Sequence, residues 1–394
     1  MVDAEAVAAS TYYASTCSLV VAMTTPAYHR LLGMGEEAFE SLEDHLERRE
    51  YEGREYRHVP DYRRGVERGT ALIADTVVRG FPKVPRTLVL AEGIPNHFED
   101  RVVVEEKLNG YNVRIADIDG EILAFSRGGQ ICPFTTRYLE RLVDLESLFE
   151  AHPEAMVCGE MIGPENPYTP HDYPGVASLE FRAFDWRDRV SGESLPVDER
   201  RDRYDAFDVP QTRLLGEYDV AEAAAEVRRI VRELDEEGRE GVVMKSPDVT
   251  TQLKYTTSAA NQGDLAYAFS LPFDYGQPFM FRRLIREAFQ SVEWDEGDDE
   301  AGERAHELGE AILLSMRETI ETIDEGGRVD EVHTVRADTE TIDVLLEHLR
   351  GQGLTIDVEE DRPEGDDRVV TFAKRVQSTN DKTRNYLDGH IVTE

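Results

Sequence analysis

The chain has 394 residues, a mass of 44.7 kDa and 40% apolar residues, enough for about two to four compact units. No apolar run approaches the roughly 18 to 20 residues of a membrane span, so no such span is expected. Residues 7–23 are apolar but follow acidic rather than basic residues, which argues against a signal peptide. The three cysteines, Cys17, Cys132 and Cys158, are isolated in the sequence. This pattern argues against a disulfide framework or a structural zinc site, and favours the cytoplasm.

The charge balance is strongly acidic, with 81 Asp and Glu against 44 Lys and Arg and a net charge of −37. The acidic residues are spread through periodic segments that also contain apolar residues, so disorder does not explain them. Only six of the basic residues are lysines. A diffuse acidic surface with arginine in place of lysine resembles proteins of salt-accumulating halophiles, because a Debye length of about 3 Å at 1 M salt weakens self-repulsion. We therefore do not take the net charge as a guide to partners.

Residues 1–66 show no single period before a charged helical stretch at 35–49, and they predict a small N-terminal module. From residue 70 the pattern favours strands and short connections, including a hairpin turn at Asp119-Gly120. Strands are expected at residues 87–90, 156–163, 179–186 and 241–246, and helices at 136–149 and 220–237. Two β-rich runs over residues 102–129 flank the hairpin turn. Antiparallel strands with inserted helices predict an α+β catalytic domain over residues 67–258.

The pattern changes again after Lys254. Amphipathic helices are expected at residues 284–289 and 303–323, on either side of an acidic stretch at 293–303 that lacks the spacing of a calcium loop. The end of the chain predicts a strand at 329–336, a helix at 339–350 with Asp338 as its N-cap, and strands at 354–359 and 367–376. We expect a helical segment over residues 259–326 and a C-terminal βαββ module over 327–394.

The chemistry-bearing residues begin with Lys107, which opens Lys-Leu-Asn-Gly at the end of an apolar strand. An Asn-Gly turn can aim the amine into a cleft, although this short pattern alone more often marks an exposed lysine at a strand end. Five further short motifs follow in order. They are Ser126-Arg127-Gly128-Gly129, Cys158-Gly159-Glu160-Met161-Ile162-Gly163, Phe181-Arg182-Ala183-Phe184-Asp185, Glu240-Gly241-Val242-Val243-Met244-Lys245 and Gln252-Leu253-Lys254-Tyr255.

These motifs in this order resemble the covalent nucleotidyltransferase superfamily of DNA ligases, RNA ligases and mRNA capping enzymes. In detail the chain is similar to the archaeal ATP-dependent RNA ligases that act as homodimers, including RGFPK at residues 79–83. The resemblance implies an ATP-grasp-like antiparallel core, ATP with Mg²⁺ or Mn²⁺, and single-stranded RNA with 5′-phosphate and 3′-hydroxyl ends. It also implies that Lys107 forms a lysyl-AMP, that AMP passes to the 5′-phosphate, and that the 3′-hydroxyl then displaces AMP.

The lysines would carry most of the phosphoryl chemistry. Lys107 must attack as a neutral amine, so we expect neighbouring cations and a bound metal to lower its pKa. Lys245 and Lys254 are candidates for this role, and they would also neutralise charge on the α-phosphoryl oxygens. The resemblance assigns the α-phosphate contact to Lys254. Gln252 stands where many relatives carry another lysine.

Two acidic residues on different strands, Glu160 and Glu240, suit Mg²⁺ because hard oxygen ligands prefer this ion. The alternative is a strand-end carboxylate that is solvated or paired with arginine. The resemblance further implies that Phe184 stacks on adenine and that Glu105 accepts from its amino group. The alternatives are a core aromatic residue and a solvated acid.

The resemblance gives Asn112 and Arg127 contacts to ribose and phosphates, although a turn asparagine and a surface arginine are the plain alternatives. A DNA ligase or a capping enzyme is the runner-up within the superfamily, but those enzymes carry an oligonucleotide-binding barrel after the last lysine motif, and this tail does not predict one. A catalytically inactive RNA-binding protein of the same fold is the other alternative. An intact Lys107 argues against it.

The helical segment is expected to form a homodimer. A stripe of apolar residues runs along residues 303–323, and a shorter one along 284–289. The residues are Leu308, Ile312, Leu313, Met316, Ile320 and Ile323, with Leu284, Ile285 and Phe289. The alternative is that both stripes pack on their own catalytic domain, since periodicity does not distinguish the two arrangements.

Overall fold

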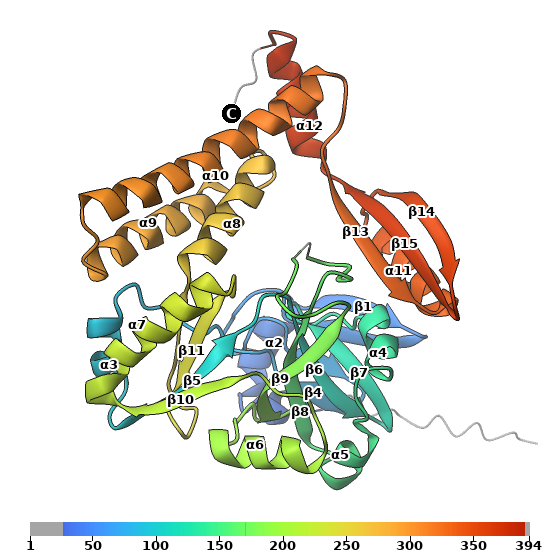
Figure 1. The fold of residues 1–394 in the computed structure, drawn as a ribbon. Coiled ribbons are helices and arrows are strands. Elements are labelled where there is room, and N and C mark those ends of the chain that lie inside the picture. The colour runs from blue at the N-terminus through green and yellow to red at the C-terminus, as the bar shows by residue number, and fades with distance from the viewer. Residues whose placement is uncertain (1–26, 170, 391–394) are drawn as a thin grey trace, which may run out of the picture.

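A computed structural model of the chain describes residues 27–169 and 171–390 (Figure 1). The expectations for residues 7–23 and Cys17 lie outside these residues. The described part contains four antiparallel sheets and confirms the α+β class. None of its helices is both long enough and apolar enough to cross a membrane. Cys132 and Cys158 are buried free thiols.

The N-terminal module consists of two short helices and one sheet. The helices are α1 (Tyr28–Leu31) and α2 (Glu36–Glu43), and the strands β1 (Glu47–Tyr51), β2 (Arg54–His58), β3 (Ala71–Ile73) and β4 (Thr76–Val78) pair in chain order. The expected helix over residues 35–49 is too long, because Glu47 already pairs with His58 as the first residue of β1. β2 pairs with β3, so the sheet runs across the expected boundary after residue 66.

Two four-stranded sheets form the catalytic domain. The first has the order β10-β5-β11-β12, with β10 (Leu214–Asp219), β5 (Arg101–Lys107), β11 (Gly241–Lys245) and β12 (Gln252–Thr256). The second has the order β7-β6-β8-β9, with β7 (Glu121–Ser126), β6 (Tyr111–Ile118), β8 (Ala155–Ile162) and β9 (Glu180–Asp188). The predicted turn between β6 and β7 is confirmed, because Asp119 and Gly120 both have positive φ, at 58° and 84°.

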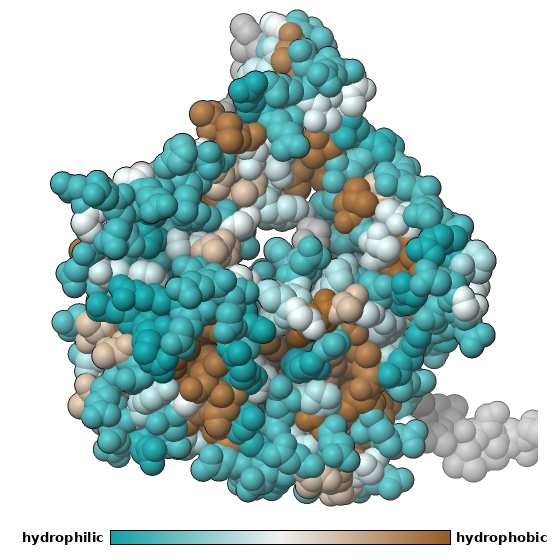
Figure 2. All heavy atoms as spheres, viewed as in Figure 1, coloured by the Kyte–Doolittle hydropathy of each residue, from teal (hydrophilic) through white to brown (hydrophobic). Residues whose placement is uncertain are grey.

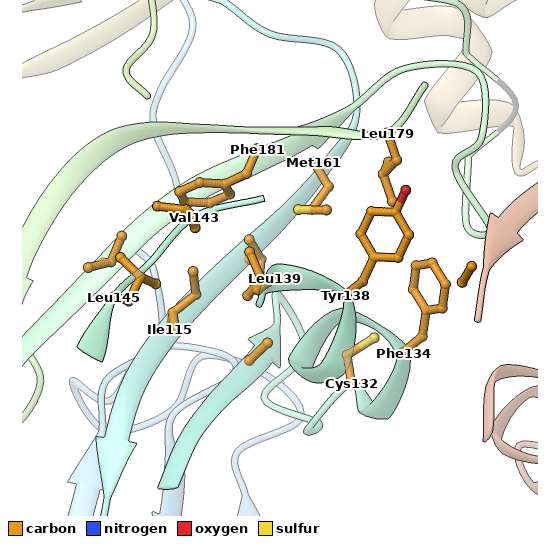
Figure 3. Close-up of a cluster of buried hydrophobic side chains, with 14 of the residues drawn as sticks. Ile115, Cys132, Phe134, Tyr138, Leu139, Val143, Leu145, Met161, Leu179 and Phe181 are labelled. Carbon is orange, nitrogen blue, oxygen red and sulfur yellow. The ribbon is translucent and has the colours of Figure 1, made fainter. Parts of the chain in front are cut away.

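Helices bury one face of each sheet. α3 (Leu90–His97) and α7 (Val220–Glu236) pack in one core with residues of β5, β11 and β12. α4 (Pro133–Leu139) and α5 (Glu146–Ala151) pack on the second sheet, where Figure 3 shows Leu139 near Ile115 and Tyr138 between Phe134 and Met161. α6 (Val197–Ala206) follows β9 and contributes Tyr204 to the same core.

Two expectations in this domain are wrong. Residues 87–90 do not form a strand, because the carboxylate of Glu293 accepts from the backbone N–H groups of Leu90 and Ala91 and so caps the start of α3. The helix expected over 136–149 is two helices, because the side chain of Asp144 accepts from the N–H of Glu146 at 3.0 Å and starts α5 afresh.

The rest of the chain forms a helical segment and a small α/β module. The helices are α8 (Ser258–Ser270), α9 (Gln277–Glu293) and α10 (Asp298–Asp324). The predicted βαββ order is confirmed as β13 (Asp330–Ala337), α11 (Thr339–Gly351), β14 (Ile356–Glu364) and β15 (Asp367–Arg375), followed by α12 (Gln377–Leu387), which was not expected. Asp338 caps α11 by accepting from the Thr341 N–H at 2.9 Å, as predicted. The acidic stretch at 293–303 is partly helical, since α10 begins at Asp298.

Candidate active site

Lys107 is the last residue of β5 and lies opposite Gly241 of β11. This register brings Lys107 beside Glu240, the residue before β11, and its ammonium forms an ion pair with the Glu240 carboxylate. The side chains of Lys107 and Glu240 are 19% and 13% exposed, so the pair is largely shielded from solvent. Two residues that the sequence placed in separate motifs therefore meet directly.

Glu160 approaches the same pair from the second sheet. It lies on β8 opposite Asn112 of β6. Burial raises the pKa of Glu160 to about 8, with Lys107 opposing the rise and Glu240 adding to it. Glu160 is thus close enough to Glu240 for the Glu240 carboxylate to disfavour ionisation of Glu160.

The oxygens around Lys107 fit a divalent cation. Within the described residues, Glu240 Oε2 and Asn112 Oδ1 are buried and have no hydrogen-bond partner. The described part of the chain contains no cluster of three or more His, Cys, Asp or Glu side chains arranged for a metal. Two carboxylates suit Mg²⁺, which keeps several waters and takes its remaining ligands from substrate phosphates.

Lys254 lies on β12 opposite Val243 of β11, and β11 separates it from β5, which carries Lys107. Burial, together with the positive charges of Lys107 and Arg86, lowers the pKa of Lys254 to about 8. In the part of the chain that the structure describes, Lys254 forms no ion pair, unlike Lys107 and Lys245. It is therefore a cation available to an anionic ligand.

Glu105 and Lys245 form a buried ion cluster, which the sequence did not indicate. The Lys245 ammonium lies 2.7 Å from the Glu105 carboxylate and donates to the carbonyl of Phe184, also at 2.7 Å. Arg200 pairs with Glu105 too, and Arg201 contacts it at 3.1 Å. Burial alone would raise the pKa of Glu105, but Lys245 and Arg200 lower it to about 2.

The occupied carboxylate changes what we expect of this pair. Glu105 already accepts from three cations, so its two carboxylate oxygens are occupied in this structure. Lys245 is 2% exposed and neutralised by Glu105, so it has little charge to offer a phosphate. Through Lys245, Glu105 connects β5, which carries Lys107, to the carbonyl of Phe184 on β9.

Phe184 forms part of an aromatic wall with Phe81. Their rings meet edge to face at 5.3 Å and 80°, and the Arg127 guanidinium lies over the Phe81 ring at 5.9 Å. Phe81 and Lys83 belong to the RGFPK segment at residues 79–83, whose part in the site was not assigned from the sequence. In the sequence, the family resemblance was the only signal for this segment.

A cavity of about 1500 Å³ brings these side chains together. Figure 2 shows an opening on this face of the molecule, between the helical segment and the catalytic sheets. The predicted site residues on the cavity wall are Glu105, Lys107, Asn112, Arg127, Glu160, Phe184, Lys245 and Lys254, and Gln252 joins them. Glu240 lies behind Lys107 and lines a neighbouring cavity of about 290 Å³.

Comparison with known proteins identifies two families along the chain. Residues 100–257 match the family described as RNA ligase, and residues 267–390 match the family described as Ligase Pab1020 C-terminal region. The protein MJ0414 of Methanocaldococcus jannaschii is 42% identical over 341 residues, which cover 83% of this chain and 86% of that protein.

Two solved structures extend this likeness to the whole fold. One described as archaeal ATP-dependent RNA ligase, form 1, is 43% identical with a TM-score of 0.87, over 92% of this chain and 98% of that one. A putative ATP-dependent DNA ligase from Aquifex aeolicus is 29% identical with a TM-score of 0.84, over 91% and 98%. The two sheets, the lysine that ends β5 and these matches define a nucleotidyltransferase-type ligase. The chain belongs to the archaeal ATP-dependent RNA ligase family.

The shifted pKa of Glu160 predicts how its replacement affects stability. An unfolded glutamate has a pKa near 4.3, so between pH 4.3 and about 8 the unfolded chain ionises at this position while Glu160 in the folded protein stays protonated. The folding stability lost in this way grows with pH over this range and stays constant above it. Glu160→Gln should therefore raise the Tm of the metal-free protein at pH 9 by about 2 °C or more, and leave it unchanged at pH 4.5. Calorimetry in high salt measures this difference.

The control is Glu50→Gln, which removes an exposed carboxylate from β1. We expect no pH-dependent difference for it. Equal Tm shifts for Glu160→Gln at both pH values would contradict the raised pKa.

Proposed function

We propose that the chain is an ATP-dependent RNA ligase that joins a 5′-phosphate to a 3′-hydroxyl in three steps at one cavity. In the first step, Lys107 Nζ forms a bond to the α-phosphorus of ATP while the bond to pyrophosphate breaks. AMP then passes to the RNA 5′-phosphate, and the 3′-hydroxyl attacks that phosphate and releases AMP. The observation that carries this proposal is that Lys107, which contacts Glu240, lines one cavity with Lys254, which forms no ion pair within the described residues.

The described side chains suit the separate parts of the first step. Lys107 must lose a proton before it attacks, and the Glu240 carboxylate in contact with its ammonium can receive that proton. Lys254 has no carboxylate partner in the described residues and can bind the α-phosphoryl oxygens. Phe184 would stack on adenine, and Arg127 and Asn112 would contact the phosphates and ribose.

Glu160 and Glu240 would hold the divalent cation, Mg²⁺ or Mn²⁺. When bound there, the cation would supply positive charge to the phosphates. We revise two of the roles expected from the sequence. Glu105 anchors Lys245 rather than adenine, and Lys245 in turn holds the carbonyl of Phe184.

DNA is the competing substrate. The relative described as a putative DNA ligase shares the layout of this chain over 98% of its own length, so the architecture alone does not separate the two activities. Ligation of matched RNA and DNA strands by the same preparation decides between them. Preferential joining of DNA would contradict the RNA assignment and leave the lysyl-AMP step intact.

The first prediction here concerns covalent chemistry. Wild-type protein incubated with α-labelled ATP and Mg²⁺ should retain the label on a denaturing gel, and the label should be lost in acid because a phosphoramidate is acid-labile. Lys107→Ala should reduce the labelling to background because it removes the attacking nitrogen. Lys382→Ala, on α12, is the matched control and should label normally. Labelling of Lys107→Ala would overturn the assignment.

Salt dependence follows from the net charge of −37. We propose that the protein is halophilic and acts in a salt-rich cytoplasm. Lowering the salt from 3 M to 0.1 M KCl lengthens the Debye length from about 2 to 10 Å and unscreens the carboxylates. The ellipticity and the Tm should both fall on dialysis. Unchanged melting over this range would contradict the proposal.

Exposed apolar residues of the helical segment support a homodimer, but fewer of the predicted residues are available for the contact. Ile323 is 3% exposed, and Leu284 and Leu308 pack against the core of α8 and α9, so these three residues serve their own chain. Leu313 and Ile320 on α10 are 63% and 43% exposed, and Phe289 on α9 is 46% exposed. We propose that these exposed residues form the two-fold contact.

Light scattering in high salt should give about twice the chain mass of 44.7 kDa for the wild type. Leu313→Asp with Ile320→Asp should give a single chain that still forms lysyl-AMP, because both side chains point to solvent in one protomer. Val358→Asp is the control, since Val358 is exposed at 42% on β14 outside the helical segment. A monomeric wild type would contradict the dimer.

A further inference from the structure

The cavity is larger than one nucleotide requires. Small-molecule pockets usually measure about 300 to 1000 Å³, whereas this one measures about 1500 Å³. Part of its wall comes from outside the nucleotidyltransferase motifs. Tyr62 and Arg68, in the loop between β2 and β3, line it on the N-terminal side.

This loop is a built feature of the N-terminal module. Val59 and Gly69 are joined by a backbone hydrogen bond of 2.7 Å at its base, and Arg63 and Val66 exchange two backbone hydrogen bonds within it. Val66 is 1% exposed and belongs to the core of the module. The loop therefore presents Tyr62 on a fixed base rather than on a free chain.

A buried arginine fixes the loop to the nucleotide site. The Arg114 guanidinium, which is fully buried, donates to the carbonyls of Gly69 and Ser126 at 2.8 Å and also to the carbonyl of Arg79. Gly69 and Gly129 pack so closely that a Cβ on either would lie within 2.5 Å of the other segment. The loop and the turn that carries Arg127 are thus one rigid wall.

Tyr62 and Arg68 have the properties of a nucleic-acid contact. Tyr62 is 71% exposed although it lines the cavity, so its ring is available for stacking. Arg68 is exposed, donates only to the carbonyl of Pro60 at 3.0 Å, and forms no ion pair within the described residues. In a chain with a net charge of −37, a polyanion can approach only where such cations stay unpaired.

We propose that Tyr62 and Arg68 bind single-stranded RNA beside the end that is joined, and that this is the task of the N-terminal module. Tyr62 stacks on an unpaired base, and Arg68 contacts a phosphate. The inference rests on the proposed function, because it takes RNA as the substrate. Stacking is well suited to molar salt, since screening weakens phosphate contacts much more than ring contacts.

The test separates RNA binding from the ATP step in the full-length protein. The probe is a fluorescent single-stranded RNA with a 5′-phosphate, and anisotropy in 1 M KCl gives its Kd. Tyr62→Ala should weaken binding about tenfold, within the range that removal of one stacked base costs, and Tyr62→Phe should restore it. Arg68→Ala should weaken binding less and reduce the slope of log Kd against log salt by about one.

The loop contains its own control. Arg64 is exposed like Arg68, but its guanidinium donates to the hydroxyl of Ser41 on α2 at 2.8 Å and does not line the cavity. Arg64→Ala should bind RNA like the wild type. Because it removes the same charge from the same loop, equal losses in Arg64→Ala and Arg68→Ala would show a general charge effect and overturn the contact.

Lysyl-AMP formation without RNA is measured on every variant. Wild-type rates in Tyr62→Ala and Arg68→Ala, together with weaker RNA binding, support the proposal. Slower labelling with unchanged RNA binding would show that the loop serves the phosphates of ATP, and would overturn it. If the wild type binds RNA but takes up no label, the proposed ligase function fails while the loop contact stands.

Discussion

The carboxylate of Glu105 joins the two sheets between which the cavity lies. It binds Lys245 of β11 and Arg200 of α6, and both of these cations also donate to the carbonyl of Phe184 on β9. Burying charges is costly, and removal of one partner leaves the others without compensation. Because side chains alternate along a strand, Glu105 and Lys107 face the same side of β5. The cluster therefore fixes the direction in which Lys107 points.

Glu106, the residue between Glu105 and Lys107, is held by ion pairs on the opposite face of β5. Glu106 faces away from Glu105, and its carboxylate pairs with Arg239 and Arg213 and accepts from the hydroxyl of Tyr173. Ion pairs thus hold β5 on both faces at the two residues that precede Lys107. The proposed nucleophile needs such a fixed position, since small displacements of a reacting group are costly.

Local patterns predicted the fold well where the signal lies within a few residues. The Asn-Gly turn after Lys107, the hairpin at Asp119-Gly120 and the N-cap at Asp338 depend on neighbouring residues, and the last two are confirmed. The ion cluster was missed because Glu105 and Arg200 are 95 positions apart. α3 was missed because its cap is Glu293, which is 203 positions from Leu90.

Arg114 illustrates a further limit of sequence reasoning. It stands on β6, where its neighbours predict an ordinary strand residue, yet it is fully buried and its partners are backbone carbonyls. Backbone carbonyls exist at every position, so no residue type in the sequence marks these three. The register of the sheets decides which carbonyls come within reach, and only the folded structure supplies it.

The shifted pKa values of Glu160 and Lys254 are those of buried groups whose charges are not fully compensated by a partner of opposite charge. Burial raises the pKa of Glu160 and lowers that of Lys254, each to about 8, although the two groups carry opposite charges in one cavity. A carboxylate that is neutralised by neighbouring cations shifts the other way, as the lowered pKa of Glu105 beside Lys245 and Arg200 shows. A ligand that brings a cation to Glu160 and phosphate oxygens to Lys254 would relieve both costs at once. A nucleoside triphosphate with its divalent metal has this combination of charges, and either component alone would relieve only one of them.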